Sequence, residues 1–182
     1  TAILVPEEHG GLGYGYSGLG LILEESGRTL TPSPLLGTAL TGAAALVIGG
    51  SPEQQSAVLP ALAAGERILS LACDEASCHQ PERIATRAET RGDSYRLNGA
   101  KAAVIDGAAA DTFIVSATTG DGVSLFLVPA TAAGVTVESY PALDISVAAT
   151  VTFEQVDLPA DALLGQLHQG QALLDRILDI AR

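Results

Sequence analysis

Basic residues are scarce in this chain. Nine lysines and arginines stand against twenty-one aspartates and glutamates, which gives a formal net charge of −12, and no dense basic run is present. A protein that binds nucleic acid needs cations to neutralise the backbone phosphates. The composition therefore argues against a nucleic-acid partner.

Cysteine is nearly absent as well. Cys73 and Cys78 are five residues apart and no second pair accompanies them. Two cysteines are too few for a disulfide scaffold, and their spacing is not that of a zinc ribbon. We therefore expect two reduced thiols in a cytoplasmic protein, and no metal site.

Long apolar runs are missing too. The longest apolar region, around residues 35–48, is broken by glycine and threonine, so no segment reaches the roughly 20 uninterrupted residues of a membrane span. A hydrophobic content of 47% with 16% charged residues argues against disorder. We expect a globular protein without a membrane span.

The first part of the chain has helical periodicity. Leu19, Ile22 and Leu23 recur at intervals of three and four, and the apolar residues after Pro34 do the same. A further helix is predicted to begin after Ser51, which can cap it and form a capping box with the glutamine three residues on. Pro60 is expected to strain or end this helix.

From Arg67 to about Phe153, short apolar runs alternate with turn residues, which is typical of antiparallel strands. The predicted strands are Ile68 to Ala72, Thr86 to Thr90, Tyr95 to Leu97, Ala102 to Ile105, Thr112 to Ala117, Ser124 to Val128, Val135 to Ser139 and Ala149 to Phe153. So many strands in fewer than about a hundred residues favour a small barrel or sandwich over a parallel α/β sheet.

We therefore predict an α+β fold in three parts. These are a partial N-terminal α-helical domain over residues 1–65, a small antiparallel β-barrel or sandwich over residues 66–164, and the start of a C-terminal helical domain over residues 165–182. The chain begins without Met, and its last residues have the pattern of an unfinished helix. We therefore expect it to be part of a longer polypeptide.

The run from Thr86 to Lys101 is predicted to be a β-hairpin. Tyr95 and Leu97 alternate with polar residues, as in a half-buried strand. Asn98 and Gly99 tolerate positive φ, so they are expected to form the tight turn.

Several segments carry recognisable motifs in a fixed order. These are Pro6 to Gly13, Leu59 to Glu66, Tyr95 to Gly107, Val151 to Val156 and Pro159 to Gly165. They resemble the Pro-Glu-x-x-Gly-Gly-x-Gly, Leu-Pro-x-Leu-x-x-Gly-Glu, Asn-Gly-x-Lys, Val-x-Phe-x-x-Val and Pro-to-Gly segments of the acyl-CoA dehydrogenases, with Asp106 replacing an Asn of the third motif. The order and spacing together carry this resemblance, which covers nearly the whole chain.

The departures fall on the positions that lie against the flavin in that family. Its Thr-Glu-Pro-x-x-Gly-Ser-Asp segment aligns so that Cys73 replaces the Thr hydroxyl and His79 replaces a small residue near phosphate. Its Trp-Ile-Thr segment aligns with Ala103, Val104 and Ile105. Ala103 therefore stands where the family has the tryptophan indole, and Ile105 stands where it has the threonine. With Ser70 on the preceding strand, these five residues are the positions that the resemblance implies for FAD binding.

Two interpretations of the departures stay open. Backbone amides can hold an isoalloxazine ring whatever the side chains are, and Ala103 leaves room for another residue to cover the ring. Alternatively, the chain has no flavin of its own and is the flavin-poor, non-catalytic partner in a hetero-oligomer, similar to actinobacterial steroid-degrading dehydrogenases built from two unlike subunits.

The resemblance implies α,β-dehydrogenation of an acyl-CoA thioester to 2-enoyl-CoA, with FAD and an electron-transfer flavoprotein as the acceptor, in a homo- or hetero-oligomer of dehydrogenase subunits. An oxygen-using flavin enzyme on the same fold, an acyl-CoA oxidase or a flavin monooxygenase, is a third possibility. The candidates for holding the anionic CoA are backbone amides, helix N-termini and a few cations such as Arg83, Arg87 or Lys101, and the sequence leaves the choice among them open.

The catalytic residue stays unknown at this level. The family's carboxylate base belongs to the C-terminal domain, outside this chain. Asp175 and Asp179 are four apart and lie on one helix face, which we interpret as a solvated face.

Overall fold

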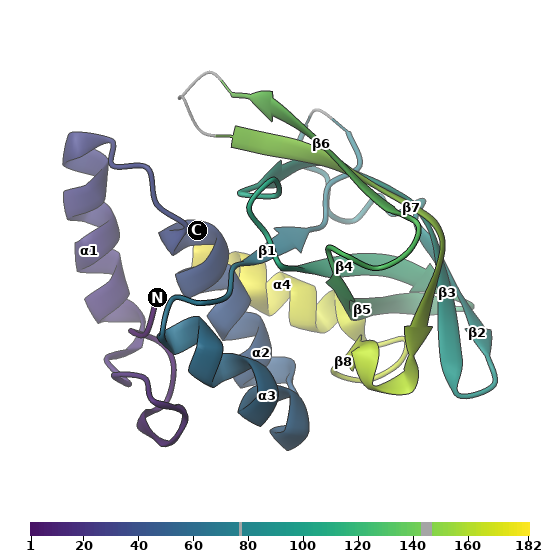
Figure 1. The fold of residues 1–182 in the computed structure, drawn as a ribbon, viewed down its shortest axis with the longest axis horizontal. Helices are drawn as coiled ribbons and strands as arrows, with labels where there is room; N and C mark the ends of the chain where they lie inside the picture. The colour runs from purple at the N-terminus through teal and green to yellow at the C-terminus, as the bar shows by residue number, and fades with distance from the viewer. Residues whose placement is uncertain (77, 143–146) are drawn as a thin grey trace.

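The computed structural model describes residues 1–76, 78–142 and 147–182, and it places a group of helices beside a folded β-sheet (Figure 1). The helices are η1 (Glu7–His9), α1 (Gly15–Thr29), the π-helical η2 (Leu35–Gly42), α2 (Ala43–Gly49), α3 (Pro52–Ala63), η3 (Ala160–Ala162) and α4 (Gly170–Ala181). The predicted helical start and the new helix at the C-terminal end are confirmed. No helix in these residues has the length and hydropathy needed to cross a membrane.

The strands follow in the middle of the chain. They are β1 (Leu69–Ala72), β2 (Arg87–Arg91), β3 (Ser94–Ile105), β4 (Thr112–Thr119), β5 (Gly122–Pro129), β6 (Val135–Pro141), β7 (Val147–Pro159) and β8 (Leu163–Leu164). Their order in the sheet is β6-β7-β3-β2-β4-β5-β8, and β1 pairs with β4. The β1–β4 and β2–β4 pairs are parallel and the others antiparallel, so the α+β class is confirmed.

The sheet is open rather than a closed barrel. Its hydrogen-bonded path ends at β6 and β8, which do not pair with each other in the described residues. It folds over a core that includes Tyr95 of β3 and Phe126 of β5, whose ring centroids lie 4.9 Å apart. The opposite face of β4 and β5 contributes Ile114 and Leu125 to a second core with the helices. Instead of a closed barrel, the predicted barrel or sandwich is an open sheet in which β4 and β5 contribute to a core on each face.

The capping box at the start of α3 forms as the sequence predicts. The Ser51 hydroxyl accepts from the Gln54 amide at 3.2 Å, and the Gln54 side-chain oxygen accepts from the Ser51 amide at 3.0 Å. The helix does not end at Pro60 but continues to Ala63. Because Pro60 has no backbone N–H, the carbonyl of Ser56 lacks its usual helical donor. Both residues lie on the exposed side of the helix, where water can replace the missing hydrogen bond.

Replacing Ser51 by alanine is expected to lower the free energy of unfolding by about 1 kcal/mol, because the first turn of α3 loses its side-chain acceptor. Urea denaturation followed by circular dichroism measures the change. Ser56→Ala is the matched control, since this exposed serine in the middle of the same helix caps nothing. Equal stability of the two variants would contradict the capping role.

The hairpin exists, but its turn is not at Asn98-Gly99. Arg91 pairs with Ser94, so the chain turns at Gly92 and Asp93. Asn98 and Gly99 instead form a bulge inside β3, where the register with β7 shifts between Leu97 and Gly99. The reason is steric: Gly99 has φ +146°, and a Cβ there would lie 2.7 Å from the Thr86 Cα. A glycine is needed for this close approach between strands, and alternation alone does not distinguish it from a turn.

The π-helix η2 fixes β1 against the helices. The Thr38 hydroxyl donates to the Leu69 carbonyl at 3.1 Å and lies 3.2 Å from the Leu69 amide, which donates to it. Gly42 lets the helix approach so closely that a Cβ on it would lie 2.8 Å from the Leu69 Cβ. π-Helical segments are rare and are frequently found at functional sites, and this one of eight residues lies beside β1, the strand that begins the candidate site.

Candidate functional site

The five predicted site residues lie on two segments: Ser70 in β1 with Cys73 and His79 in the loop that follows it, and Ala103 and Ile105 near the end of β3. Ser70 is fully buried in β1, and its hydroxyl donates to the carbonyl of Ile105 in β3. Cys73 is buried immediately after β1. The structure therefore brings Ser70 to Ile105 at the end of β3, although the two are thirty-five residues apart in the chain.

Ala103 and Ile105 present an apolar surface at this end of β3. Ile105 is 46% exposed and Ala103 is also exposed. Ala103 has φ +51°, an unusual value for a residue with a side chain, and its amide donates to the Tyr140 hydroxyl of β6 at 3.1 Å. Tyr140 is not among the predicted site residues, because the predicted strand ends one residue before it.

His79 is held by an acid rather than by the other predicted site residues. Its Nδ1 lies 2.8 Å from Asp74 Oδ2, and its side chain is 53% exposed. The other Asp74 oxygen accepts from the Gln80 amide at 2.8 Å. Although a thiol, a carboxylate and an imidazole gather here, they do not form a group that could hold a metal ion among the described residues. The pair fixes the loop that follows β1.

A buried ion pair fastens the same loop to the sheet. Lys101 of β3 is 0% exposed, and its ammonium donates to Glu75 Oε1 at 2.7 Å and to the Ser116 hydroxyl at 3.0 Å. Glu75 also accepts from the amides of Ala85 and Thr86, at 2.6 and 3.0 Å. The prediction that Lys101 is a cation for CoA is therefore wrong, because its charge is buried and already neutralised.

Burial and hydrogen bonding act in opposite directions on this pair. Burial raises the pKa of Glu75, but the hydrogen bonds from Lys101, Thr86 and Ala85 outweigh it and hold this pKa below its usual range. Burial lowers the pKa of Lys101, and the neighbouring Glu75 opposes that effect. The carboxylate is thus stabilised by its contacts, and the loop depends on them.

The Cys73 thiol is kept protonated. Burial, together with the nearby Asp74 carboxylate, raises its pKa to about 12. A thiolate is the reactive form of cysteine. Cys73 is therefore not a nucleophile at neutral pH.

A thiol-specific alkylating reagent at pH 7.5 is expected to modify Cys78, which is exposed, and to leave Cys73 unmodified until urea unfolds the protein. Peptide mass spectrometry distinguishes the two sites. Rapid labelling of Cys73 in the folded protein would contradict its burial.

Asp106, at the turn that follows β3, carries a buried carboxyl oxygen without a hydrogen-bond partner among the described residues. That oxygen lies 2.9 Å from where a Cβ on Gly37 of η2 would be. Burial raises the pKa of this carboxyl. Buried polar atoms normally have a hydrogen-bond partner. The unpaired Asp106 oxygen is therefore an exception, and it lies where η2, β1 and β3 meet.

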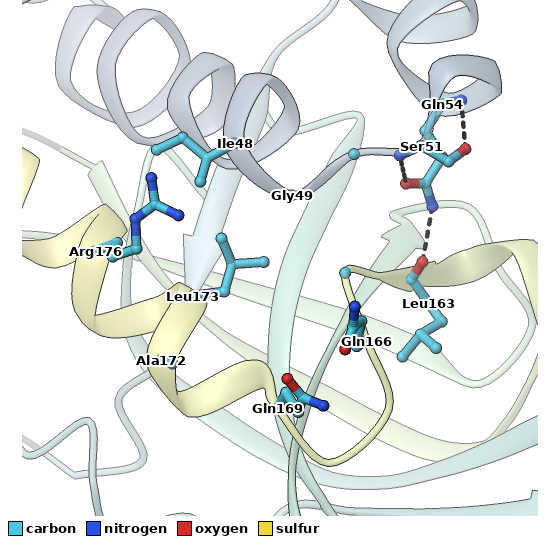
Figure 2. Close-up of a pocket in the computed structure, with 12 residues that line it drawn as sticks. Ile48, Gly49, Ser51, Gln54, Leu163, Gln166, Gln169, Ala172, Leu173 and Arg176 are labelled. Atoms are coloured by element: carbon cyan, nitrogen blue, oxygen red, sulfur yellow. Dashed lines mark hydrogen bonds between the residues drawn. The ribbon is translucent and has the colours of Figure 1, made fainter.

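A separate hollow of about 390 Å³ lies between the helices and β8, away from these residues (Figure 2). Gln54 of α3 spans one side of it and donates to the carbonyls of Leu163 and Asp161 at 2.9 and 2.7 Å. Arg176 is the one charged residue of its lining. Its one hydroxyl, that of Ser51, is engaged in capping α3, and the described lining holds no carboxylate, imidazole or thiol. The residues at β1 and β3 are therefore the stronger candidate site.

Comparison with known proteins gives consistent matches over this chain. Residues 1–66 match the N-terminal domain of the acyl-CoA dehydrogenases, and residues 74–156 match their middle domain. Among curated relatives, the cyclohex-1-ene-1-carbonyl-CoA dehydrogenase of Geobacter metallireducens is 32% identical over 98% of this chain and 50% of its own length. The chain thus spans about half the length of the curated relatives it matches.

Solved structures agree in fold. An FAD-dependent dehydrogenase superposes with a TM-score of 0.89 and 28% identity, over 99% of this chain and 52% of its own. The ChsE4-ChsE5 complex from Mycobacterium tuberculosis gives a TM-score of 0.87 and 25% identity, over 100% of this chain and 49% of that one. The two domain matches in the expected order, together with relatives of this identity, show that the chain belongs to the acyl-CoA dehydrogenase family.

Proposed function

We propose that this chain forms the N-terminal helical and middle β-domains of a flavin-dependent acyl-CoA dehydrogenase, with boundaries at residues 1–65 and 66–164, and that residues 165–182 begin a third, helical domain. The enzyme would oxidise an acyl-CoA thioester to 2-enoyl-CoA. The match of two successive domains of one family over most of the chain carries this proposal.

The residues at the end of β1 fit the isoalloxazine ring of FAD. β1 pairs with β4 along one edge only in the described residues. On its other edge Thr38 occupies the main chain of Leu69, so the main chain of the strand beyond Leu69 would meet the polar rim of a ring. Ile105 and Tyr140 supply exposed apolar and aromatic surface for its faces. Cys73, Ala103 and Ile105 would then act through main chain and shape, without the hydroxyls and indole of the family.

When bound, FAD would supply the hydride acceptor for the oxidation. The residues of this chain would orient the ring and exclude water: Ser70 joins β1 to the end of β3, and the Lys101–Glu75 pair holds the loop that carries His79. We propose that electrons pass to an electron-transfer flavoprotein, and that the enzyme is a cytoplasmic oligomer of dehydrogenase subunits.

The test is an anaerobic titration of the purified protein with all three proposed domains present, using acyl-CoA thioesters of graded chain length and a steroid-derived thioester. Bleaching of the oxidised flavin band by one of them, without added oxygen, is the expected result. A flavin that every thioester leaves oxidised would contradict the proposed activity.

A flavin-poor partner subunit is the second candidate, and two observations favour it. The structure of ChsE4-ChsE5, one of the chain's structural neighbours, is that of a complex of two different proteins. In addition, the Ser70 hydroxyl and the Ala103 amide are already engaged within this chain. Co-purification with a dehydrogenase subunit encoded nearby separates the candidates: activity and flavin only in the mixed complex would favour the partner role.

A further inference from the structure

Three strands place one row of side chains on the outer face of the sheet. Ile105 of β3 pairs with Ala148 of β7, which pairs with Tyr140 of β6. Directly opposed residues of antiparallel strands point to the same face. Their neighbours Val104 and Ala149 belong to the core between the sheet halves, so the row faces away from that core.

The phenol ring of Tyr140 lies across β7. Its hydroxyl accepts from the Ala103 amide at 3.1 Å, and β6 and β3 are separated by β7, roughly 9 to 10 Å at two strand spacings. The side chain must therefore pass over the strand between them. Ala148 is only 7% exposed although it belongs to neither core cluster of the described residues, as expected if the ring of Tyr140 covers it.

The result is a flat aromatic surface that is itself open to a ligand. Tyr140 remains 39% exposed and Ile105 46%, and the surface adjoins Ser70, whose hydroxyl bonds the Ile105 carbonyl. A phenol held flat by a hydrogen bond at its tip loses little further freedom when a planar ring stacks on it. Ala103, beside the ring tip, is too small to obstruct that stacking.

We propose that Tyr140 is the side chain that stacks against the isoalloxazine ring of FAD in this protein. The inference rests on the proposed function and adds a residue to it. The hydrogen bond to Ala103 holds the phenol at the angle for stacking, and Ile105 borders the ring at the other end of the row. The tyrosine on β6 thus provides the aromatic contact that β3 itself lacks.

The experiment compares FAD binding by the wild-type protein with binding by Tyr140→Ala, Tyr140→Phe and Glu138→Ala. Glu138 is exposed on the same face of β6, two residues away, and serves as the matched control. Fluorescence titration with FAD gives the dissociation constant, and the emission of the bound flavin reports the contact, because a phenol quenches a flavin that it touches and a phenyl ring does not.

Tyr140→Ala is expected to raise the dissociation constant for FAD about tenfold, the size of one aromatic contact. Tyr140→Phe is expected to retain most of the affinity while the bound flavin becomes more fluorescent. Glu138→Ala should change neither quantity. The brighter flavin of Tyr140→Phe separates stacking from a merely structural role, which would leave the emission unchanged.

Unchanged or tighter FAD binding by Tyr140→Ala, with normal binding by the wild-type protein, would overturn this inference alone. Tighter binding would mean that the phenol occupies the place of the ring. A wild-type protein that binds no FAD, alone or with a partner subunit, would overturn the proposed function and this inference together.

Discussion

Replacing Lys101 by methionine is expected to lower the free energy of unfolding by about 3–5 kcal/mol at neutral pH, the cost of removing one partner from a buried ion pair. Methionine fills the space of the lysine stem, so packing changes little. Glu75, however, is left as a largely buried carboxylate that has lost its cation. Denaturant unfolding of the two proteins measures the difference.

The pH dependence gives a second check on the same residue. In the wild-type protein the pKa of Glu75 is lowered, so its stabilising contribution is present above the usual carboxyl pKa and is lost as the pH falls. Without Lys101, burial of Glu75 is opposed only by the amides of Ala85 and Thr86, so its pKa rises relative to that in the wild type and its stabilising contribution at neutral pH is smaller. The difference in stability between wild type and Lys101→Met should therefore shrink below about pH 4.

Two further variants test the charge argument. Lys101→Met combined with Glu75→Gln should recover much of the lost stability, since no uncompensated charge remains and the glutamine oxygen can still accept from the Thr86 amide. Arg28→Met, which removes an exposed cation from α1, should change stability little. A double variant that is as unstable as Lys101→Met would show that packing, not charge, is the cause.

Replacing Gly99 by alanine is expected to cost about 2–4 kcal/mol, as a steric clash joined to backbone strain does. The new Cβ would lie 2.6 Å from the Thr86 hydroxyl and 2.7 Å from the Thr86 Cα, and the latter is backbone that cannot rotate away. The bulge in β3 would then have to open. Thermal unfolding monitored by circular dichroism measures the loss.

Gly92→Ala is the matched control for this prediction. Gly92 also has positive φ, +60°, but no atom lies within 4 Å of a Cβ placed there. This variant should lose only about 1 kcal/mol from the strained turn. A smaller loss for Gly99→Ala than for Gly92→Ala would contradict the close approach of the strands at Thr86.

Local patterns predicted the elements well and their junctions poorly. Ser51 and Gln54 predict the start of α3, because both partners of a capping box lie within four consecutive residues. Asn98-Gly99 was interpreted as a turn because a bulge and a turn both use glycine, and only the position of Thr86 on the neighbouring strand decides between them. The open sheet likewise depends on contacts between distant segments.

The site shows the same limit. The order of the motifs predicts five positions for FAD binding, namely Ser70, Cys73, His79, Ala103 and Ile105. Their role in binding FAD remains a proposal. Tyr140 has no local signal, since its partner Ala103 lies thirty-seven residues away. Lys101 looked like a free cation because sequence does not show burial, whereas the structure pairs it with Glu75.

The most direct test of the proposed function is a visible absorption spectrum of the purified protein, recorded before and after denaturation to count the flavin released per chain. The proposal that this chain helps to hold FAD in a working dehydrogenase predicts about one flavin per chain in the protein purified alone. A colourless protein that acquires flavin only with a second, unlike subunit, at less than one per chain, would contradict it.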